Sequence, residues 1–325
     1  MSDLKHRIIE TNGIKMHIAE QGEGPLVVLL HGFPETWYSW RYQIPVLAEQ
    51  GFHVVAPDLR GFGDTEQPKD IDQYTILHLV GDIVGLLDAL NEETAVIVGN
   101  DWGATVAWNA ALLRPDRFRG IVALTVPMMP QPPIPPTTVF PQSDKELFYT
   151  LYFQTPGVAE KEFEKDIYST VHNLFYSASG DAGPRKGNDG TPNPFSMVSR
   201  EKGLLSALPM PKITSWLKEE DLKVYEKAFK KTGFSGGLNY YRNLDRNREL
   251  LSCFNGMKVT IPAQFIVGSR DVGLSMPGMD QIILDMHKLV PNLRKNIFIE
   301  DCGHWAQQEK PKEISAAIIS FMKSL

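Results

Sequence analysis

This sequence of 325 residues has very few cysteines, and its basic residues are outnumbered by its acidic ones. Cys253 and Cys302 are its only cysteines, too few for a disulfide framework and not spaced for zinc, so we expect two reduced thiols. Lys and Arg number 33 against 39 Asp and Glu, and a net charge of -6 argues against nucleic acid as a partner. The eight histidines form no His-x-x-x-His pair. We therefore expect no metal and no cofactor.

Long apolar runs are also missing. None approaches the roughly 20 residues that a membrane-spanning helix needs, and residues 1–7 lack the apolar segment of a signal peptide. These features predict a cytoplasmic protein without a membrane partner. With 42% hydrophobic and 22% charged residues, the composition is that of an ordinary globular chain. Its length suits one large domain or a domain with an inserted piece.

Short apolar runs of strand length do recur along the chain. Residues 7–10 and 15–20 flank Asn12-Gly13, which predicts a hairpin. Strands that alternate with helices, each strand apolar on both faces, predict an α/β fold whose mostly parallel sheet is covered on both sides. The expected strands lie at 25–30, 52–56, 95–98, 121–126, 259–268 and 296–300, and the expected helices at 37–50, 74–90, 102–114 and 313–325.

A proline-rich stretch interrupts this alternation. Seven prolines between Pro127 and Pro141 exclude a helix interior or a central strand there. Residues 145–245 then read as mostly helical and aromatic, apart from a polar loop at 177–193 that we expect to be mobile. We predict a helical cap domain at 136–245, inserted into a core domain formed by 1–135 and 246–325.

The most informative motif is Gly99-Asn100-Asp101-Trp102-Gly103, between an apolar run and a helix pattern rich in alanine. A strand, a sharp turn and a helix form the context of a nucleophile elbow, in which flanking glycines let strand and helix approach closely. The central residue of such an elbow is usually serine, and here it is Asp101. The alternative is that Asp101 only caps the following helix, since aspartate is a preferred N-cap residue.

A carboxylate nucleophile restricts the chemistry. Serine attacking a saturated carbon would form an ether that water cannot cleave, whereas a carboxylate forms an ester whose carbonyl belongs to the enzyme. Water can hydrolyse that ester through a tetrahedral intermediate. Asp101 therefore indicates an alkylating substrate, such as an epoxide or a haloalkane.

Hydrolysis of such an ester needs a base and a group that orients it. His304 follows the last predicted strand directly, and the chain order nucleophile, acid, histidine is that of α/β-hydrolases. Asp271 lies in the turn after the strand that includes 264–268, and we expect it to orient His304. Asp301 is the competing acid, but we interpret it as a turn residue, because neighbours in such a loop rarely face each other.

The tetrahedral intermediate also needs hydrogen-bond donors for its oxyanion. The expected pair are the backbone N–H groups of Phe33, in the loop after an earlier strand, and Trp102, next to the nucleophile. Glu35 has two readings that the sequence leaves open. It is either a helix-start carboxylate or a group that holds water near His304.

These motifs together resemble those of a soluble epoxide hydrolase of the α/β-hydrolase fold, over nearly the whole chain. The resemblance implies Asp101 as nucleophile, His304 as base, Asp271 as its orienting acid, and Tyr149 and Tyr241 as two acids from the cap. Asn100 departs from the family, which usually has histidine before the nucleophile. The motifs are His31-Gly-Phe-Pro34, Pro57-Asp-Leu-Arg-Gly-Phe-Gly63, Asp101-Trp-Gly103, Phe153-Gln-Thr-Pro-Gly-Val-Ala-Glu160, Asn239-Tyr-Tyr-Arg242 and Gly303-His-Trp305.

The chemistry of epoxide opening gives a second, independent reason to expect acids such as Tyr149 and Tyr241. Opening an epoxide creates a strongly basic alkoxide, and a phenol with a pKa near 10 can donate to it while staying protonated at neutral pH. Taken singly, either tyrosine could equally be a core residue of the cap.

The expected function is conversion of an epoxide to a vicinal diol through an ester on Asp101, with a small-molecule epoxide and water as partners. The protein is expected to be a monomer or a homodimer. One alternative is a haloalkane or haloacid dehalogenase with the same Asp-His-Asp triad, and another is a non-catalytic ligand receptor on the same fold.

Overall fold

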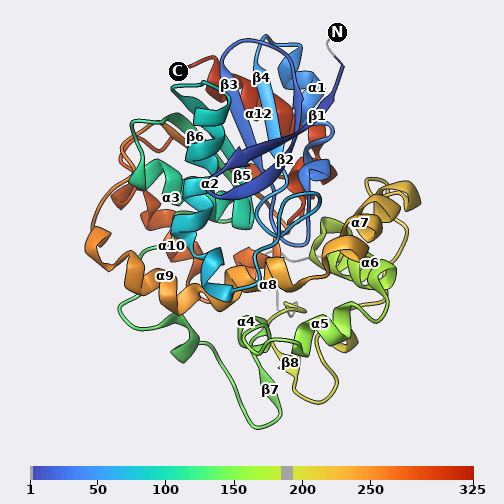
Figure 1. Ribbon diagram of the computed structural model, residues 1–325. Helices are drawn as coiled ribbons and strands as arrows, with labels where there is room; N and C mark the ends of the chain where they lie inside the picture. The colour runs from blue at the N-terminus through green and yellow to red at the C-terminus, as the bar shows by residue number, and fades with distance from the viewer. Residues whose placement is uncertain (1–2, 184–192) are drawn as a thin grey trace.

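The computed structural model describes residues 3–183 and 193–325, and its centre is an eight-stranded sheet (Figure 1). The strand order is β1-β2-β4-β3-β5-β6-β9-β10. β2 runs antiparallel to both β1 and β4, and the strands from β4 to β10 are parallel. The strands are β1 (Lys5–Thr11), β2 (Ile14–Gln21), β3 (Leu26–Leu30), β4 (His53–Pro57), β5 (Ala95–Asn100), β6 (Phe118–Leu124), β9 (Ala263–Gly268) and β10 (Ile297–Ile299).

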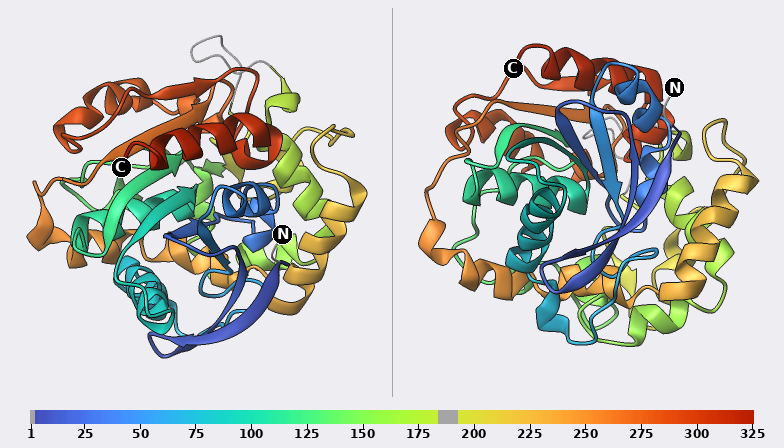
Figure 2. Two further views of the ribbon diagram at one scale, coloured as in Figure 1. Left: turned by 90° about the horizontal axis from the view of Figure 1, so that it is seen from above. Right: turned by 45° about the horizontal axis from the view of Figure 1, so that its top comes forward.

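Helices cover both faces of this sheet, as predicted (Figure 2). On one face, α1 (Gln43–Ala48) and α12 (Pro311–Met322) pack over valine and leucine side chains of β3, β4 and β5. On the other face lie α2 (Ile76–Ala89), α3 (Trp102–Leu113) and α10 (Met279–Asp285). Because β3 and β5 are buried on both sides, their sequences are continuous apolar runs.

The hairpin prediction at Asn12-Gly13 is confirmed. β1 and β2 pair from Lys5–Glu20 to Thr11–Ile14, and both turn residues have positive φ, 45° and 77°. This conformation suits a two-residue turn whose twist matches that of the strands.

Several predicted boundaries were wrong, and proline or backbone strain explains them. The expected helix at 37–50 is split into η1 (Trp37–Trp40) and α1, because Pro45 has no N–H to donate to the carbonyl of Arg41. The strand expected from residue 259 begins only after Pro262, for the same reason. β6 stops before Thr125, whose φ of 68° is incompatible with a strand.

A second group of elements lies over the carboxyl ends of the parallel strands (Figure 1). β7 and β8 form a small antiparallel sheet of their own. Of the polar loop expected at 177–193, residues 177–178 still belong to α6, and 184–192 lie outside the described residues. The elements are β7 (Glu146–Leu147), α4 (Tyr149–Tyr152), α5 (Val158–Phe163), α6 (Ile167–Ala178), η4 (Gly180–Ala182), β8 (Val198–Ser199), α7 (Glu219–Thr232), α8 (Ser235–Arg242) and α9 (Leu244–Leu250).

Short helical turns complete the connections. They are η2 (Ile71–Tyr74), η3 (Pro136–Thr138), η5 (Leu205–Ala207), η6 (Ser252–Phe254), η7 (Val272–Ser275), η8 (Met286–Lys288) and α11 (Ala306–Glu309). Across residues 3–183 and 193–325, no helix is both long enough and apolar enough to cross a membrane.

Candidate active site

Asp101 occupies a strained turn between β5 and α3. Its backbone has φ 53° and ψ -119°, a conformation that a non-glycine residue rarely adopts. The surrounding glycines allow the close approach that this turn requires. A Cβ at Gly99 would lie 2.2 Å from the carbonyl oxygen of Gly103, and one at Gly32 would lie 2.4 Å from the Asp101 side chain. The local sequence thus creates a nucleophile elbow whose carboxylate projects from the turn.

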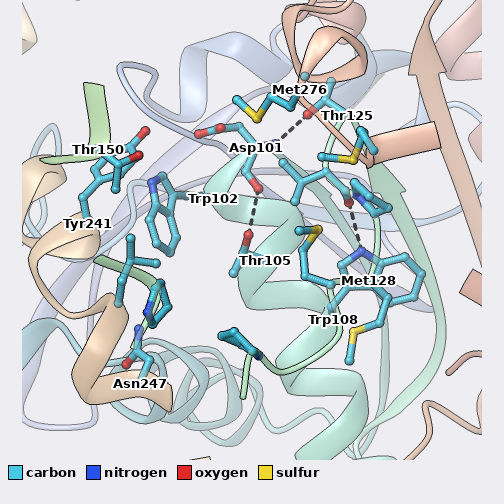
Figure 3. A pocket seen from close by; sticks show the side chains of 18 of the residues that line it. Asp101, Trp102, Thr105, Trp108, Thr125, Met128, Thr150, Tyr241, Asn247 and Met276 are labelled. Carbon is cyan, nitrogen blue, oxygen red and sulfur yellow. Dashed lines mark hydrogen bonds between the residues drawn. The ribbon is translucent and has the colours of Figure 1, made fainter. Parts of the chain in front are cut away.

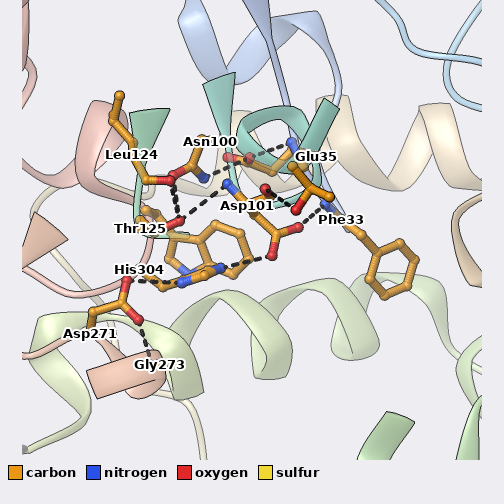
Figure 4. Close-up of polar contacts among 12 residues, drawn as sticks. Phe33, Glu35, Asn100, Asp101, Leu124, Thr125, Asp271, Gly273 and His304 are labelled. Atoms are coloured by element: carbon orange, nitrogen blue, oxygen red, sulfur yellow. Dashed lines mark hydrogen bonds and ion pairs between the residues drawn. The ribbon is translucent and has the colours of Figure 1, made fainter. Parts of the chain in front are cut away.

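The Asp101 carboxylate does not cap α3, so the helix-cap reading is wrong. Its Oδ1 accepts a hydrogen bond from the Phe33 N–H at 2.9 Å, and its Oδ2 lies 3.3 Å from Nε2 of His304 (Figure 4). Trp102 is the first residue of α3, where a backbone N–H has no intrahelical acceptor. The carboxylate therefore lies between a backbone donor on one side and an imidazole on the other.

His304 joins the two aspartates. Its Nδ1 lies 3.0 Å from Oδ2 of Asp271, which is almost fully buried and also accepts the Gly273 N–H at 2.6 Å (Figure 4). Asp301, the competing acid, instead forms an exposed ion pair with Arg270. The structure therefore brings Asp271, and not Asp301, to the ring of His304.

These contacts change the protonation of the imidazole. Burial alone would lower the pKa of His304, but the nearby carboxylates of Asp271 and Asp101 outweigh it and raise the pKa well above its ordinary value. A proton on His304 is thus held between two negative charges.

Tyr149 and Tyr241 line the same cavity as Asp101 and His304, although one begins α4 and the other lies near the end of α8. Their ring centroids are 6.0 Å apart, and the Tyr241 ring meets the Trp102 ring edge-on at 5.0 Å. The cavity has a volume of about 560 Å³, and Figure 3 shows Tyr241 and Trp102 beside Asp101. Its walls are mostly apolar, with methionines such as Met128 and Met276.

Both phenols stay protonated at neutral pH. Desolvation, and more weakly the Asp101 charge, raises the pKa of Tyr149 to about 12, although a hydrogen bond with Thr150 opposes the shift. Desolvation, Asp101 and Tyr149 raise the pKa of Tyr241 well above its ordinary value. Two neutral hydroxyl donors therefore face a cavity that holds a carboxylate and an imidazole.

Glu35 is fully buried and contacts Asn100, the residue before Asp101. Its Oε2 accepts from the Gly32 N–H at 3.0 Å and the Asn100 amide at 3.1 Å, and its Oε1 accepts from Gln307 at 2.7 Å and Gln308 at 2.9 Å. The helix-start reading is wrong, because the adjacent Thr36 caps the following turn. Burial raises the pKa of Glu35 to about 7, although its hydrogen bonds oppose the shift.

Asn100 connects this carboxylate to the elbow. Its amide donates to Glu35, and its side-chain oxygen lies 3.2 Å from the Thr125 hydroxyl, whose single proton can also go to the Leu124 carbonyl at 2.7 Å. That hydroxyl oxygen in turn accepts the Asp101 N–H at 3.1 Å. Asn100, which departs from the family pattern, therefore belongs to a chain of polar contacts that ends on the backbone N–H of Asp101.

Sequence reasoning missed Thr125 and the glutamines of α11. Thr125 follows an apolar strand, and nothing local marks its positive φ. Gln307 and Gln308 follow Gly303-His304-Trp305 closely, so proximity to that motif was the one available signal.

The described part of the chain contains no group of three or more His, Cys, Asp or Glu side chains that could hold a metal ion. Cys302, close in sequence to His304, is fully buried, and burial raises the pKa of its thiol far above the ordinary value.

Comparison with known proteins defines the class. Residues 25–311 match the family model described as alpha/beta hydrolase fold, and the chain belongs to this family. Epoxide hydrolase A of Mycobacterium tuberculosis is 40% identical over 98% of this chain and 97% of its own length. Epoxide hydrolase 3 of Siraitia grosvenorii is 41% identical over 99% of each chain.

Solved structures agree with the sequence relatives. An epoxide hydrolase from an endophytic Streptomyces superposes with a TM-score of 0.93 at 39% identity, over 98% of this chain and 95% of the other. Potato (Solanum tuberosum) epoxide hydrolase I gives 0.88 at 38% identity, over 99% and 100%. Within the α/β-hydrolase fold, the chain thus groups with proteins named epoxide hydrolases.

Proposed function

We propose that this protein is an epoxide hydrolase that forms vicinal diols through a covalent ester on Asp101. The observation that carries the proposal is a single cavity that contains both a carboxylate nucleophile and two phenol proton donors. A carboxylate at a strained elbow, paired with His304 and Asp271, shares that cavity with the phenols of Tyr149 and Tyr241. A nucleophile for carbon and two proton donors for the ring oxygen are the groups that epoxide opening needs.

In the first step, Oδ2 of Asp101 attacks a carbon of the epoxide while Oδ1 stays bound to the Phe33 N–H. The C–O bond of the ring breaks, and its electrons pass to the ring oxygen. Tyr149 and Tyr241 hydrogen-bond that oxygen, and one of them gives it a proton. The resulting phenolate then takes a proton from solvent, as the raised pKa of each phenol favours. The products of this step are a hydroxyalkyl ester and an Asp101 without charge.

In the second step, His304 removes a proton from water, which attacks the ester carbonyl carbon. Oδ1 becomes the oxyanion and is stabilised by the backbone N–H groups of Phe33 and Trp102. The acyl C–O bond then breaks, and the leaving oxygen takes the proton held by His304. The diol leaves with an oxygen that belonged to Asp101, and the new carboxylic acid loses its proton to solvent. The oxygen of water remains in the regenerated carboxylate.

Alkylation itself prepares His304 for the second step. Two carboxylates raise the pKa of His304 in the free enzyme, and one of them loses its charge when Asp101 becomes an ester. The pKa of His304 therefore falls on alkylation, and Asp271 alone then orients the neutral base. The proton taken up by the alkoxide is balanced by the one released when the carboxylate is regenerated, and His304 recovers its proton when Asp101 regains its charge. The cycle therefore leaves the charge of the site unchanged.

Two further assignments belong to this proposal. Glu35 helps to hold the hydrolytic water through its contacts with Asn100, Gln307 and Gln308, which lie behind Asp101. Residues 136–245 form the cap domain and 1–135 with 246–325 form the core domain. Placement of Tyr149 and Tyr241 in α4 and α8 supports the division, since the cap then supplies the donors and the core supplies the triad.

An isotope experiment tests the function and the mechanism. With enzyme in excess over an epoxide in water labelled with oxygen-18, the first diol should carry no label, and peptide mass spectrometry should find the label on Asp101. Direct attack of water on the epoxide would put the label in the diol instead. A parallel assay with haloalkanes distinguishes the dehalogenase alternative, because halide release without diol formation from any epoxide would overturn the proposal.

A further inference from the structure

The carboxylate of Glu309 holds the backbone on both sides of His304. Its Oε2 accepts the Gly303 N–H at 2.9 Å, and its Oε1 accepts the Trp305 N–H at 3.0 Å. Glu309 ends α11, the short helix that follows His304. A single charged side chain therefore binds the residues immediately before and after the proposed base.

The same carboxylate also reaches the segment after α6. Its Oε2 accepts a third hydrogen bond, from the Gly180 N–H at 2.9 Å, and the His304 N–H donates to the carbonyl of Ala178 at 2.9 Å. The two backbones are in close contact, because a Cβ at Gly303 would lie 2.2 Å from the Gly180 nitrogen. Glu309 thus joins the loop of the base to the end of α6.

When Glu309 is ionised, its hydrogen bonds are charge-assisted and hold this loop more firmly than neutral ones would. Burial raises the pKa of Glu309 to about 7, although the three N–H groups oppose the shift. Glu309 has no part in the two steps described above, so its contacts require a separate explanation.

We propose that Glu309 is a positioning residue that fixes His304 for hydrolysis of the ester, by tying the His304 loop to the segment after α6. This inference rests on the proposed function, because it assigns Glu309 to the second step only. The nucleophile and the two phenols lie outside the contacts of Glu309, so alkylation proceeds without it. A displacement of the base by about 1 Å can cost on the order of 100-fold in rate.

The test measures the two steps separately in Glu309→Gln. A glutamine side chain has one carbonyl oxygen and one amide group, so it cannot accept hydrogen bonds at both ends as the carboxylate does. The rate of ester formation, measured by rapid mixing and intact-protein mass spectrometry, should stay within about twofold of the wild-type rate. Ester hydrolysis should slow by roughly 10- to 100-fold, so the ester should accumulate during turnover. Glu313→Gln, which removes the same charge from an exposed position on α12, should behave as wild type.

Gly180→Ala provides a second approach if Glu309→Gln does not fold. Its new Cβ would lie 3.0 Å from the Gly303 nitrogen and 3.1 Å from Oε2 of Glu309, so it disturbs the same contacts from the other side. Slower hydrolysis with unchanged alkylation supports the proposal in either variant. Equal slowing of both steps, or no slowing of hydrolysis, overturns it. If wild-type enzyme formed no ester in the same assay, the proposed function itself would fail.

Discussion

Replacement of His304 by glutamine should separate the two chemical steps. Nε2 of His304 lies 3.3 Å from Oδ2 of Asp101, where it can reach a water that attacks the ester, but attack on the epoxide needs only the carboxylate and the phenols. Glutamine keeps a polar side chain at the site and removes the base. We therefore expect His304→Gln to react with substrate and to stop at the ester.

The expected slowing of ester hydrolysis follows from the proposed role of His304 as a general base. A positioned general base contributes roughly 10²- to 10⁴-fold, so the barrier to hydrolysis should rise by about 3–5 kcal/mol at 1.36 kcal/mol per tenfold. The variant also loses a cation beside Asp101. Because the Asp101 carboxylate keeps its hydrogen bond from the Phe33 N–H, the effect of this loss on alkylation should be smaller than the effect on hydrolysis.

Intact-protein mass spectrometry provides the assay. After incubation with an epoxide, the variant should be heavier by the whole mass of the substrate, since ring opening expels no leaving group, and peptide mapping should place the addition on Asp101. A haloalkane would add only its alkyl group. His287→Gln, at an exposed histidine, is the matched control and should be unmodified, like wild type, once the substrate has been consumed. Unmodified His304→Gln, with a substrate that wild type consumes, would refute the covalent mechanism.

Three further predictions follow from the site. Tyr149→Phe and Tyr241→Phe should each slow alkylation by roughly 10- to 1,000-fold. The double variant should show almost no alkylation. A wild-type rate of single-turnover alkylation in the double variant would show that both tyrosines serve only to pack the cap. Cys302→Ala should retain epoxide opening, because the buried thiol has a raised pKa and forms little thiolate; loss of chemistry in a folded variant would contradict Asp101 as nucleophile. The folded-state pKa of His304 is raised above the unfolded value of about 6.5, so its stabilising effect is fully present below that pH and is lost as pH rises through the folded pKa. Thermal unfolding against pH should therefore show the stability advantage of wild type over His304→Gln shrinking above about pH 6.5, and a constant difference would show that His304 gains no proton affinity on folding.

The sequence by itself determined the features that depend on local chemistry. Apolar runs separated by amphipathic segments determined a parallel sheet between two helical layers, because each strand must bury both faces. Gly99-x-Asp101-x-Gly103 determined a carboxylate at an elbow, because the small residues needed for the turn lie within five positions. The turn at Asn12-Gly13 is likewise determined by its own two residues, which both adopt a positive φ.

Proline and backbone strain limited the accuracy of the boundaries. Pro45 and Pro262 moved the starts of a helix and a strand, and Thr125 ended β6 early with a positive φ. Thr125 adopts that conformation where its hydroxyl meets the Asp101 N–H, a contact with the turn that follows β5. No pattern along the chain records such a contact.

Only the tertiary structure decided which distant groups share the site. Asp271 and Asp301 were both plausible from sequence, and the carboxyl end of β9 places Asp271 at the imidazole while Asp301 turns outward to Arg270. Glu35 was ambiguous because its partners, Asn100 of β5 and two glutamines of α11, come from two segments distant from it in the sequence. Side-chain burial and charge at the site depend on how those segments meet, and this is why residue type and spacing alone could not assign them.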